Sequence, residues 1–377
     1  SSLGRVVAVK RLRAGLLAEA EENGVRAEDM ELLFRREALT TALLEHPNIV
    51  PVHDLGMDAQ GRPVLAMKLV RGERWDQKIH HDKHLALDEF LARHLPILID
   101  VTQAVGFAHA RGIVHRDLKP SQVMVGEFGE VLLMDWGISM LHDPAVAASS
   151  PHTPIGELVP TRDHARNPAG TPAYMAREQT LFTAEEVGPW TDIYLLGGML
   201  YYLLTLHAPH SAANSQESFA LAIKGNVVAP EVDSPARGIP PDLSAICLKA
   251  LARDPNDRYP STRAFLEALQ DFQTGAGKRR EAVRMIDEVR ARLATHPTRY
   301  DDLTVLNNLV IQANALWPGH AETDVLKTRV LVRFAEAALA NNDLVLARLM
   351  AESIDHPPAR AEELGKVVAR ERRRHRD

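Results

Sequence analysis

Two motifs that carry carboxylates lie between residues 113 and 137 and constrain this sequence more than any other feature. His115-Arg116-Asp117 is followed two positions later by Lys119, and Asp135-Trp136-Gly137 begins 18 positions after Asp117. Apolar, partly β-branched runs surround both motifs, so the segment is predicted to form short strands and loops. Helical patterns precede and follow it. We therefore expect a loop-rich segment with several charged groups inside a mainly helical region.

The residues before position 70 predict a small region of strands with one helix. Residues 25–45 predict the helix, because leucines recur near a 3.6-residue period among charges. Three short apolar runs are typical of strands, at 5–10, 49–56 and 62–70. From about residue 85 the pattern is helical, except at 113–137 and at a long irregular loop over 142–172. A small strand-rich lobe followed by a larger helical lobe is an α+β arrangement.

Length and composition limit the class of protein. A chain of 377 residues exceeds what one hydrophobic core usually serves, so two domains are expected. The formal net charge of −6 provides no general basic field for nucleic acid or a membrane surface. The single cysteine, Cys247, excludes an internal disulfide and indicates a reducing, cytoplasmic location. The chain starts at Ser1 without a methionine and enters a strand almost at once, so we expect it to be cut from a longer protein.

The character of the sequence changes after Thr274-Gly275-Ala276-Gly277. Residues 278–377 predict successive amphipathic helices, at 278–297, 301–316, 321–340 and 343–354. The stretch around Asn341-Asn342-Asp343 resembles a tetratricopeptide-type helix–turn–helix, but no clear 34-residue period is visible, and a generic helical bundle is equally compatible. We expect a region for protein partners here. The basic run at 370–377 is typical of a solvated helix end; a docking patch for an acidic partner is the alternative.

The two motifs and several others together resemble those of protein kinases, and their residues are similar to those of bacterial eukaryotic-like serine/threonine kinases. Ala8-Val9-Lys10 resembles the strand that carries the phosphate-binding lysine of that family. Residues 170–178, GTPAYMARE, resemble the end of its activation segment. The resemblance covers about residues 3–272. It implies a bilobal kinase domain at 1–273, with a small lobe at about 1–70 and a helical lobe at about 71–273.

The resemblance assigns catalytic and metal-binding roles to residues of the two motifs. Asp117 would orient the substrate hydroxyl, and Lys119 would contact the γ-phosphate of ATP. Asp135 would hold Mg²⁺ against the phosphates, with Gln122 as the second ligand. Thr171 would help to select serine and threonine substrates in proteins.

Other residues are expected at the nucleotide or in the supporting structure. Lys10 would contact the α- and β-phosphates of ATP, and Glu37 would be its ion-pair partner, although Asp29, Glu31 and Glu45 flank the same region. On resemblance, Met67 is the gatekeeper, Lys68 to Val70 form the hinge facing the adenine, and Ala8 and Met124 enclose the purine. A buried pair of Glu178 with Arg258 is expected, as is an aspartate, Asp192, that anchors the catalytic loop.

Activation is expected to involve the residue before the catalytic aspartate. Kinases with an arginine at the position of Arg116 usually need a phosphate on the activation segment to neutralise it. The candidates for this modification are Ser149, Ser150, Thr153 and Thr161.

Two departures from the family bear on activity. No G-x-G-x-x-G loop precedes Lys10, where only Gly4 is present, and Gln122 replaces the usual asparagine. Glutamine keeps the amide oxygen but is one methylene longer, so coordination requires a different rotamer. Two functions therefore stay open from the sequence: an active kinase, and a pseudokinase or scaffold that binds nucleotide or partners without catalysis.

Overall fold

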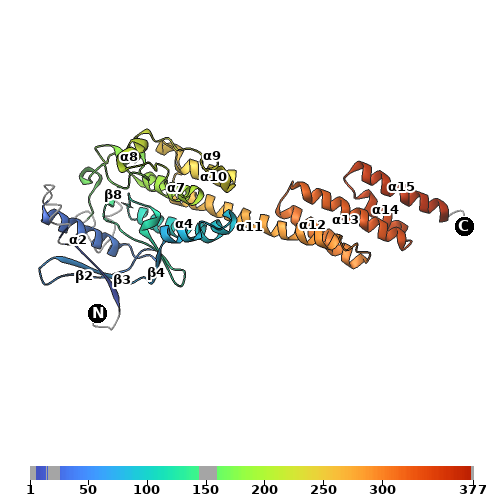
Figure 1. Cartoon of the computed structure of the whole chain (residues 1–377), viewed down its shortest axis with the longest axis horizontal. Coiled ribbons are helices and arrows are strands. Elements are labelled where there is room, and N and C mark those ends of the chain that lie inside the picture. The colour runs from blue at the N-terminus through green and yellow to red at the C-terminus, as the bar shows by residue number, and fades with distance from the viewer. Residues whose placement is uncertain (1–5, 14, 16–25, 144–158, 375–377) are drawn as a thin grey trace. The chain divides into compact units, whose positions relative to one another are not determined.

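The computed structural model describes residues 6–13, 15, 26–143 and 159–374, and divides into two compact units at residue 272 (Figure 1). Each unit has its own hydrophobic core. None of the described helices is long and apolar enough to cross a membrane. Gly4 and the serines and threonine at 149, 150 and 153 lie outside the described residues.

The first unit begins with an antiparallel sheet of three strands covered by one helix. The strands are β1 (Val7–Arg11), β2 (Val52–Met57) and β3 (Pro63–Lys68), in the order β1-β3-β2, and the helix is α2 (Ala27–Leu43). Side chains alternate in β3, so that Leu65 and Met67 point into a core shared with Phe34 and Ala38 of α2. The helix predicted at 25–45 is confirmed, although one of its leucines, Leu32, is 46% exposed.

The rest of the first unit is mainly helical and is built around α7 (Pro189–Thr205). Almost every residue of this helix is buried, as expected for a helix that is apolar all round. Helix α4 (Leu87–His109) and helix α10 (Pro241–Ala250) pack against it. The other helices are α3 (Trp75–Asp82), α8 (Ser215–Lys224) and α9 (Pro230–Asp233); short 3₁₀ turns lie at 120–122, 162–164, 177–180, 235–237 and 255–257.

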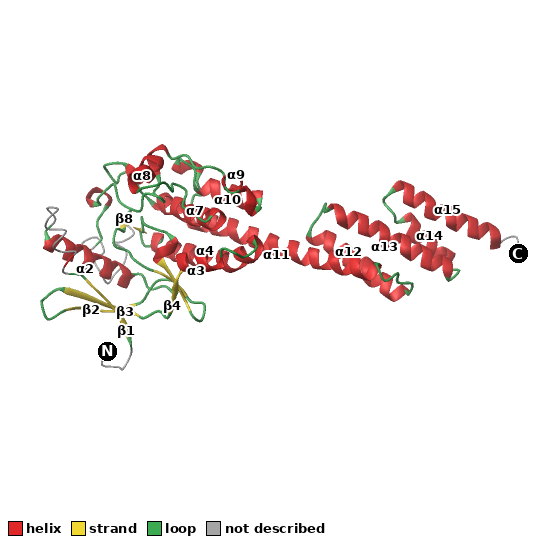
Figure 2. Ribbon diagram, viewed as in Figure 1, coloured by secondary structure: helices red, strands yellow, loops and turns green. Residues whose placement is uncertain are grey.

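Short strands flank the two acidic motifs, which lie in loops, as predicted (Figure 2). Strand β5 (Ile113–Val114) precedes the first motif and pairs with β8 (Met140–Leu141). Strands β4 (Gly72–Arg74), β6 (Val123–Gly126) and β7 (Val131–Leu133) form a second small sheet in the order β4-β6-β7. Because β6–β7 is a hairpin, the residues before and after it are brought side by side. The α+β arrangement with a small strand-rich region and a larger helical region is confirmed.

The helix predicted at 278–297 begins earlier in the structure. Helix α11 runs without interruption from Thr262 to Leu293, through Gly275-Ala276-Gly277. A glycine inside a helix costs only about 1 kcal/mol relative to alanine. Strong helix formers on both sides, among them Leu269 and Arg280, outweigh that cost.

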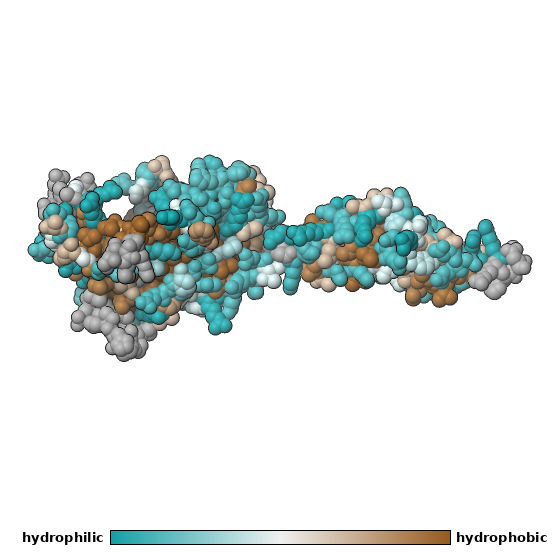
Figure 3. Space-filling model, turned by 90° about the horizontal axis from the view of Figure 1, so that it is seen from below, coloured by the Kyte–Doolittle hydropathy of each residue, from teal (hydrophilic) through white to brown (hydrophobic). Residues whose placement is uncertain are grey.

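The second unit contains successive helices, as predicted. They are α12 (Tyr300–Leu316), α13 (Ala321–Ala340), α14 (Leu344–Glu352) and α15 (Pro357–Arg374). The turn between α13 and α14 is at Asn341-Asn342-Asp343, where Asn342 has a φ of 61° and the Asp343 carboxylate accepts a hydrogen bond from Leu346 N at 3.0 Å. Figure 3 shows hydrophobic patches on this unit among mostly hydrophilic residues, and Val345 on α14 is 82% exposed.

Candidate active site

The loop after β5 carries the first acidic motif, and α7 holds its backbone. The Asp192 carboxylate accepts hydrogen bonds from the backbone N–H of His115 and of Arg116, both at 2.8 Å. Burial alone would raise the pKa of Asp192, but its bonds to His109 and to this loop outweigh burial and lower it. The predicted anchoring aspartate is therefore present, and it stays ionised inside the core.

Asp117 lies in a triangle of polar groups. Its Oδ2 accepts a hydrogen bond from Lys119 Nζ at 2.8 Å, and its Oδ1 accepts one from Thr171 Oγ1 at 2.6 Å. Lys119 Nζ also donates to Thr171 Oγ1 at 2.6 Å. Thr171 is 54 positions away in sequence, so only the fold brings it to the motif. The sequence resemblance singled out all three residues, and the structure places them together.

Asp135 and Gln122 face each other across the β6–β7 hairpin. Gln122 Nε2 donates to Asp135 Oδ2 at 3.1 Å and to Asp117 Oδ2 at 3.4 Å. A carboxylate and an amide oxygen are hard oxygen donors of the kind that Mg²⁺ prefers, so the residue types fit this ion. The amide now presents its NH₂ group, and its oxygen would have to turn toward the ion.

The backbone around Asp135 explains the glycine of the second motif. Asp135 has a φ of 59°, in the left-handed region. A Cβ atom added at Gly137 would lie 3.2 Å from Asp135 Oδ1 and 3.6 Å from Glu37 Oε2. A Cβ atom would therefore crowd the Asp135 carboxylate and reach ordinary van der Waals contact with Glu37.

Lys10 of β1 and Glu37 of α2 form an ion pair with a distance of 2.5 Å between Nζ and Oε1. Asp29 and Glu31, which sequence reasoning left open as partners, instead pair with Arg26 and Arg35. Burial raises the pKa of Glu37; Lys10 lowers it, and Asp135 nearby raises it further. The pair therefore links the small lobe electrostatically to the second acidic motif.

A cavity of about 240 Å³ opens between these groups. Six of the predicted site residues line it: Lys10, Glu37, Met67, Met124, Asp135 and Gln122. Ala8, Lys68 and Val70 do not line it. The Lys68 ammonium is 3.7 Å from Glu130 on β7 instead.

Several lining residues were not found from the sequence. Arg74 at the end of β4 is the only charged one among them, and its guanidinium is bonded to Asp76 at 2.8 Å. The others are Thr41, Val50, Val52, Leu65, Ser121 and Met134. They belong to no motif, and strand alternation in β2 and β3 was the only available signal for the apolar ones.

The end of the activation-segment motif is held by the predicted buried ion pair. Arg258 Nη1 lies 2.7 Å from Glu178 Oε1 and Arg258 Nη2 lies 3.1 Å from Oε2. Thr191 Oγ1 donates to the same carboxylate at 2.9 Å. Both charged side chains are almost fully buried, at 3% and 0% exposure.

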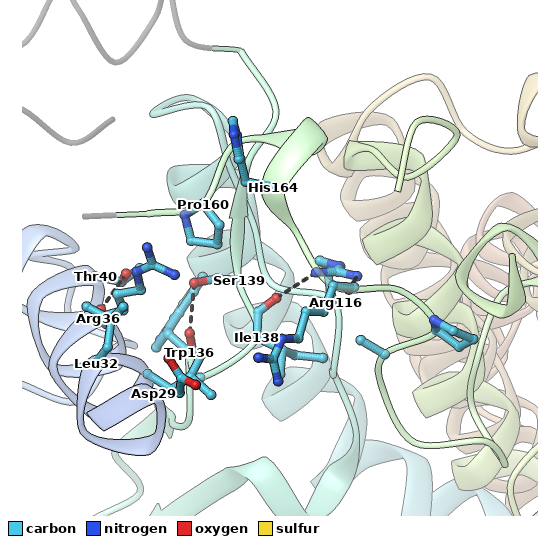
Figure 4. A pocket seen from close by; sticks show the side chains of 15 residues that line it. Asp29, Leu32, Arg36, Thr40, Arg116, Trp136, Ile138, Ser139, Pro160 and His164 are labelled. Atoms are coloured by element: carbon cyan, nitrogen blue, oxygen red, sulfur yellow. Dashed lines mark hydrogen bonds between the residues drawn. The ribbon is translucent and has the colours of Figure 1, made fainter. Parts of the chain in front are cut away.

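A second cavity, of about 400 Å³, lies beside Arg116 between α2 and residues 136–139 and 160–169 (Figure 4). Arg116 is buried and has a φ of 72°. Burial lowers its pKa to about 10, and Asp192 nearby raises it. Thr161, the one described candidate for phosphorylation, bonds His164 Nδ1 at 2.9 Å near the rim of this cavity.

Comparison with known proteins agrees with this geometry. The sequence pattern of the family described as "Protein kinase domain" matches residues 2–270. Serine/threonine-protein kinase PknD of Chlamydia trachomatis is 33% identical over 295 residues, which cover 72% of this chain and 29% of that protein. A probable serine/threonine-protein kinase of Streptomyces coelicolor is 34% identical over 277 residues, covering 72% of this chain and 37% of that protein. The chain thus spans about a third of the length of these relatives, and it belongs to the protein kinase family.

Proposed function

We propose that this chain is a serine/threonine protein kinase that transfers the γ-phosphate of ATP to serine or threonine hydroxyls of proteins. The printed names of its relatives support this function. The observation that carries it is the triangle of Asp117, Lys119 and Thr171 beside Asp135. A carboxylate with two fixed donors is positioned in advance, which is what phosphoryl transfer requires from the protein.

Each residue then has a distinct task. Asp117 orients the substrate hydroxyl and takes its proton as the new oxygen–phosphorus bond forms and the bond to the β-phosphate oxygen breaks. Lys119 neutralises charge on the phosphoryl group in transfer. Lys10, held by Glu37, contacts the α- and β-phosphates. Thr171 contacts the catalytic carboxylate and favours an aliphatic hydroxyl substrate.

Asp135 and Gln122 would hold Mg²⁺ in this scheme. When bound, this ion supplies neutralisation of the phosphate charge. Gln122 must rotate its amide so that Oε1 replaces Nε2 on the side of Asp135. The long side chain has the freedom to do so, at the loss of two hydrogen bonds to carboxylates.

The orientation of Gln122 also supports the second candidate, a pseudokinase that binds nucleotide without transferring phosphate. In this case the Gln122 amide stays bonded to Asp117 and Asp135 and occupies the position of an ion. The two functions differ in one measurable property, since only the first moves the γ-phosphate.

Autophosphorylation of the full-length protein with γ-labelled ATP and Mg²⁺ tests both, beside an Asp117→Asn control. Label on serine or threonine that is lost in the control supports the kinase. ATP that raises the melting temperature without any label supports the pseudokinase. If there is no label and no thermal shift, both nucleotide functions are refuted.

We further propose that the second unit binds protein partners. The support is the exposure of apolar side chains on helix α14, where Val345 is 82% and Leu349 is 54% exposed. These residues lie four positions apart and so share one face of the helix. Val345→Asp with Leu349→Asp in the full chain should abolish cross-links from α14 to partners in cells without changing autophosphorylation; unchanged cross-links would contradict this role.

A further inference from the structure

Arg116 is held by uncharged oxygens. Its Nη2 donates to the Arg166 carbonyl at 2.7 Å and to Asn167 Oδ1 at 2.9 Å, and its Nη1 donates to the Ile138 carbonyl at 3.2 Å (Figure 4 shows the last of these). The side chain is only 2% exposed and forms no ion pair with any residue that the structure describes. Carbonyl and amide oxygens therefore bond both of its terminal nitrogens, while its buried Nε has no hydrogen-bond partner among the described residues.

The other end of the Asn167 amide is bonded to a different part of the chain. Asn167 Nδ2 lies 3.1 Å from the Glu178 carbonyl, 2.7 Å from the Leu181 carbonyl and 3.0 Å from the Thr183 carbonyl. A guanidinium needs an acceptor and three carbonyls need a donor, so the network itself fixes which amide atom is oxygen and which is nitrogen. One side chain thus joins the catalytic loop to residues 178–183.

A second amide completes the connection. Gln179 Nε2 donates to the backbone carbonyl of Arg116 at 2.7 Å and to that of Ala169 at 3.0 Å, while its Oε1 accepts from Ala176 N at 3.1 Å. We call Asn167 and Gln179 the amide clasp. The clasp bonds both the side chain and the backbone carbonyl of Arg116. The Arg116 backbone has a left-handed φ, and such a conformation persists only where neighbouring groups hold it in place.

We propose that Asn167 is a positioning residue that keeps the catalytic loop in working geometry without a phosphate on the activation segment. This inference rests on the proposed function. A phosphate on such a segment acts by offering acceptor oxygens to the arginine before the catalytic aspartate. Here the clasp offers acceptors from within the chain. Since Asp117 follows Arg116 directly, losing the clasp should lower kcat and leave the KM for ATP nearly unchanged.

Two substitutions separate this role from simple neutralisation of Arg116. Asn167→Ala removes every bond of the side chain. Asn167→Asp has the same shape and would offer Arg116 a charged acceptor, yet it places an oxygen against three carbonyl oxygens. If neutralising Arg116 were the whole role, the aspartate would serve as well as asparagine. The clasp predicts that both variants are impaired. Asn256→Ala is the matched control, because Asn256 is exposed and its side-chain amide bonds only Asp254.

The experiment uses full-length protein treated with a phosphatase, with the absence of phosphate verified by intact mass. With a serine/threonine peptide substrate, we expect unphosphorylated wild type and Asn256→Ala to keep at least a third of the kcat of phosphorylated wild type. Asn167→Ala and Asn167→Asp should lose ten- to a hundredfold in kcat, with KM for ATP within threefold. A loss of more than tenfold on dephosphorylation of wild type overturns the inference, and so does full activity of Asn167→Asp.

Hydrogen exchange gives a readout that does not depend on catalysis. In unphosphorylated protein without nucleotide, the backbone amides of residues 166–183 should exchange at least tenfold faster in Asn167→Ala than in wild type, while those of α10 stay the same. If no form of the protein transfers phosphate, the proposed kinase function fails, but this comparison still decides whether the clasp holds the segment. Equal exchange in the two proteins overturns it.

Discussion

The pair of Glu178 with Arg258 allows a quantitative test of what holds residues 177–180 in place. Both side chains are almost fully buried, and their two contacts are 2.7 and 3.1 Å. Removing one partner of such a pair leaves the other charge buried and uncompensated, at a cost of about 3–5 kcal/mol. We therefore expect Glu178→Gln to lower the free energy of unfolding by about 3 kcal/mol or more. That is a large share of the roughly 5–15 kcal/mol that stabilises a typical domain.

Arg258→Met should be the more damaging of the two changes. Arg258 also donates to the backbone carbonyls of Ala252, Trp190 and Arg253, at 2.8, 3.0 and 3.3 Å. Each of these bonds adds about 1 kcal/mol. The double variant Glu178→Gln with Arg258→Met leaves no unpaired charge, so its loss should be at least about 2 kcal/mol smaller than the sum of the single losses.

Urea unfolding followed by tryptophan fluorescence measures these effects in the first unit, which contains three of the four tryptophans. Glu267→Gln is the matched control, because its pair with Arg263 is exposed at 57% and 86%. It should change the free energy of unfolding by less than about 0.5 kcal/mol. A loss below about 1 kcal/mol for Glu178→Gln, or strict additivity in the double variant, would refute the reasoning.

Three further predictions concern titration and metal binding. Burial raises the pKa of Glu37, so this carboxylate becomes protonated, and stops pairing with Lys10, at a pH above the ordinary glutamate pKa. The value of kcat/KM for ATP should therefore fall as the pH decreases through that range. Glu37→Gln should lack this acidic limb in the pH–rate profile. Burial lowers the pKa of His210 to about 4, so the unfolded chain binds a proton at this histidine more readily than the folded chain. The free energy of unfolding should therefore fall by up to about 3 kcal/mol between pH 6.5 and pH 4, as measured by urea titration. The fall should be smaller in His210→Gln. Gln122→Ala should raise the Mg²⁺ concentration for half-maximal velocity by about tenfold in kinase assays; no change would exclude Gln122 as a ligand.

Acid stability should also depend on Asp192, whose pKa is lowered in the folded state. Its contribution is present above the unfolded pKa of about 4 and is lost as pH falls through the folded value. Asp192→Asn should therefore flatten the fall in the free energy of unfolding below pH 4, as measured by urea titration. An unchanged slope would contradict this role.

The sequence identified the groups that carry the chemistry more readily than their arrangement. Asp117, Lys119 and Asp135 belong to a motif with fixed spacing, and the ion pairs of Lys10 and Glu178 follow from the same register. Residues whose role depends on distant contacts left no pattern. Asn167 meets carbonyls 11 to 16 positions away, and the orientation of the Gln122 amide depends on two carboxylates.

The boundaries of helix α11 also depend on contacts that the sequence does not show. The sequence predicted a helix from residue 278, after the glycines at 275 and 277, but a propensity difference of about 1 kcal/mol is small beside packing on both sides. Leu269 is buried before them and Ala282 and Ile286 are buried after them, so α11 contributes to both cores. These tertiary contacts, which the sequence does not display, add to the local helix propensity on both sides of the glycines.

The left-handed backbone at Arg116 and Asp135 has a consequence for efforts to make this protein more robust. Conformations of this kind cost about 1–3 kcal/mol at a residue other than glycine. Glycine at either position would relieve that strain, and a search for thermostable variants would tend to select it. The same change would delete a guanidinium bonded to residues 166 and 167 or a carboxylate at the proposed metal site. Selection for heat resistance alone should thus drift toward well-folded but inert descendants, and any such screen needs a catalytic filter.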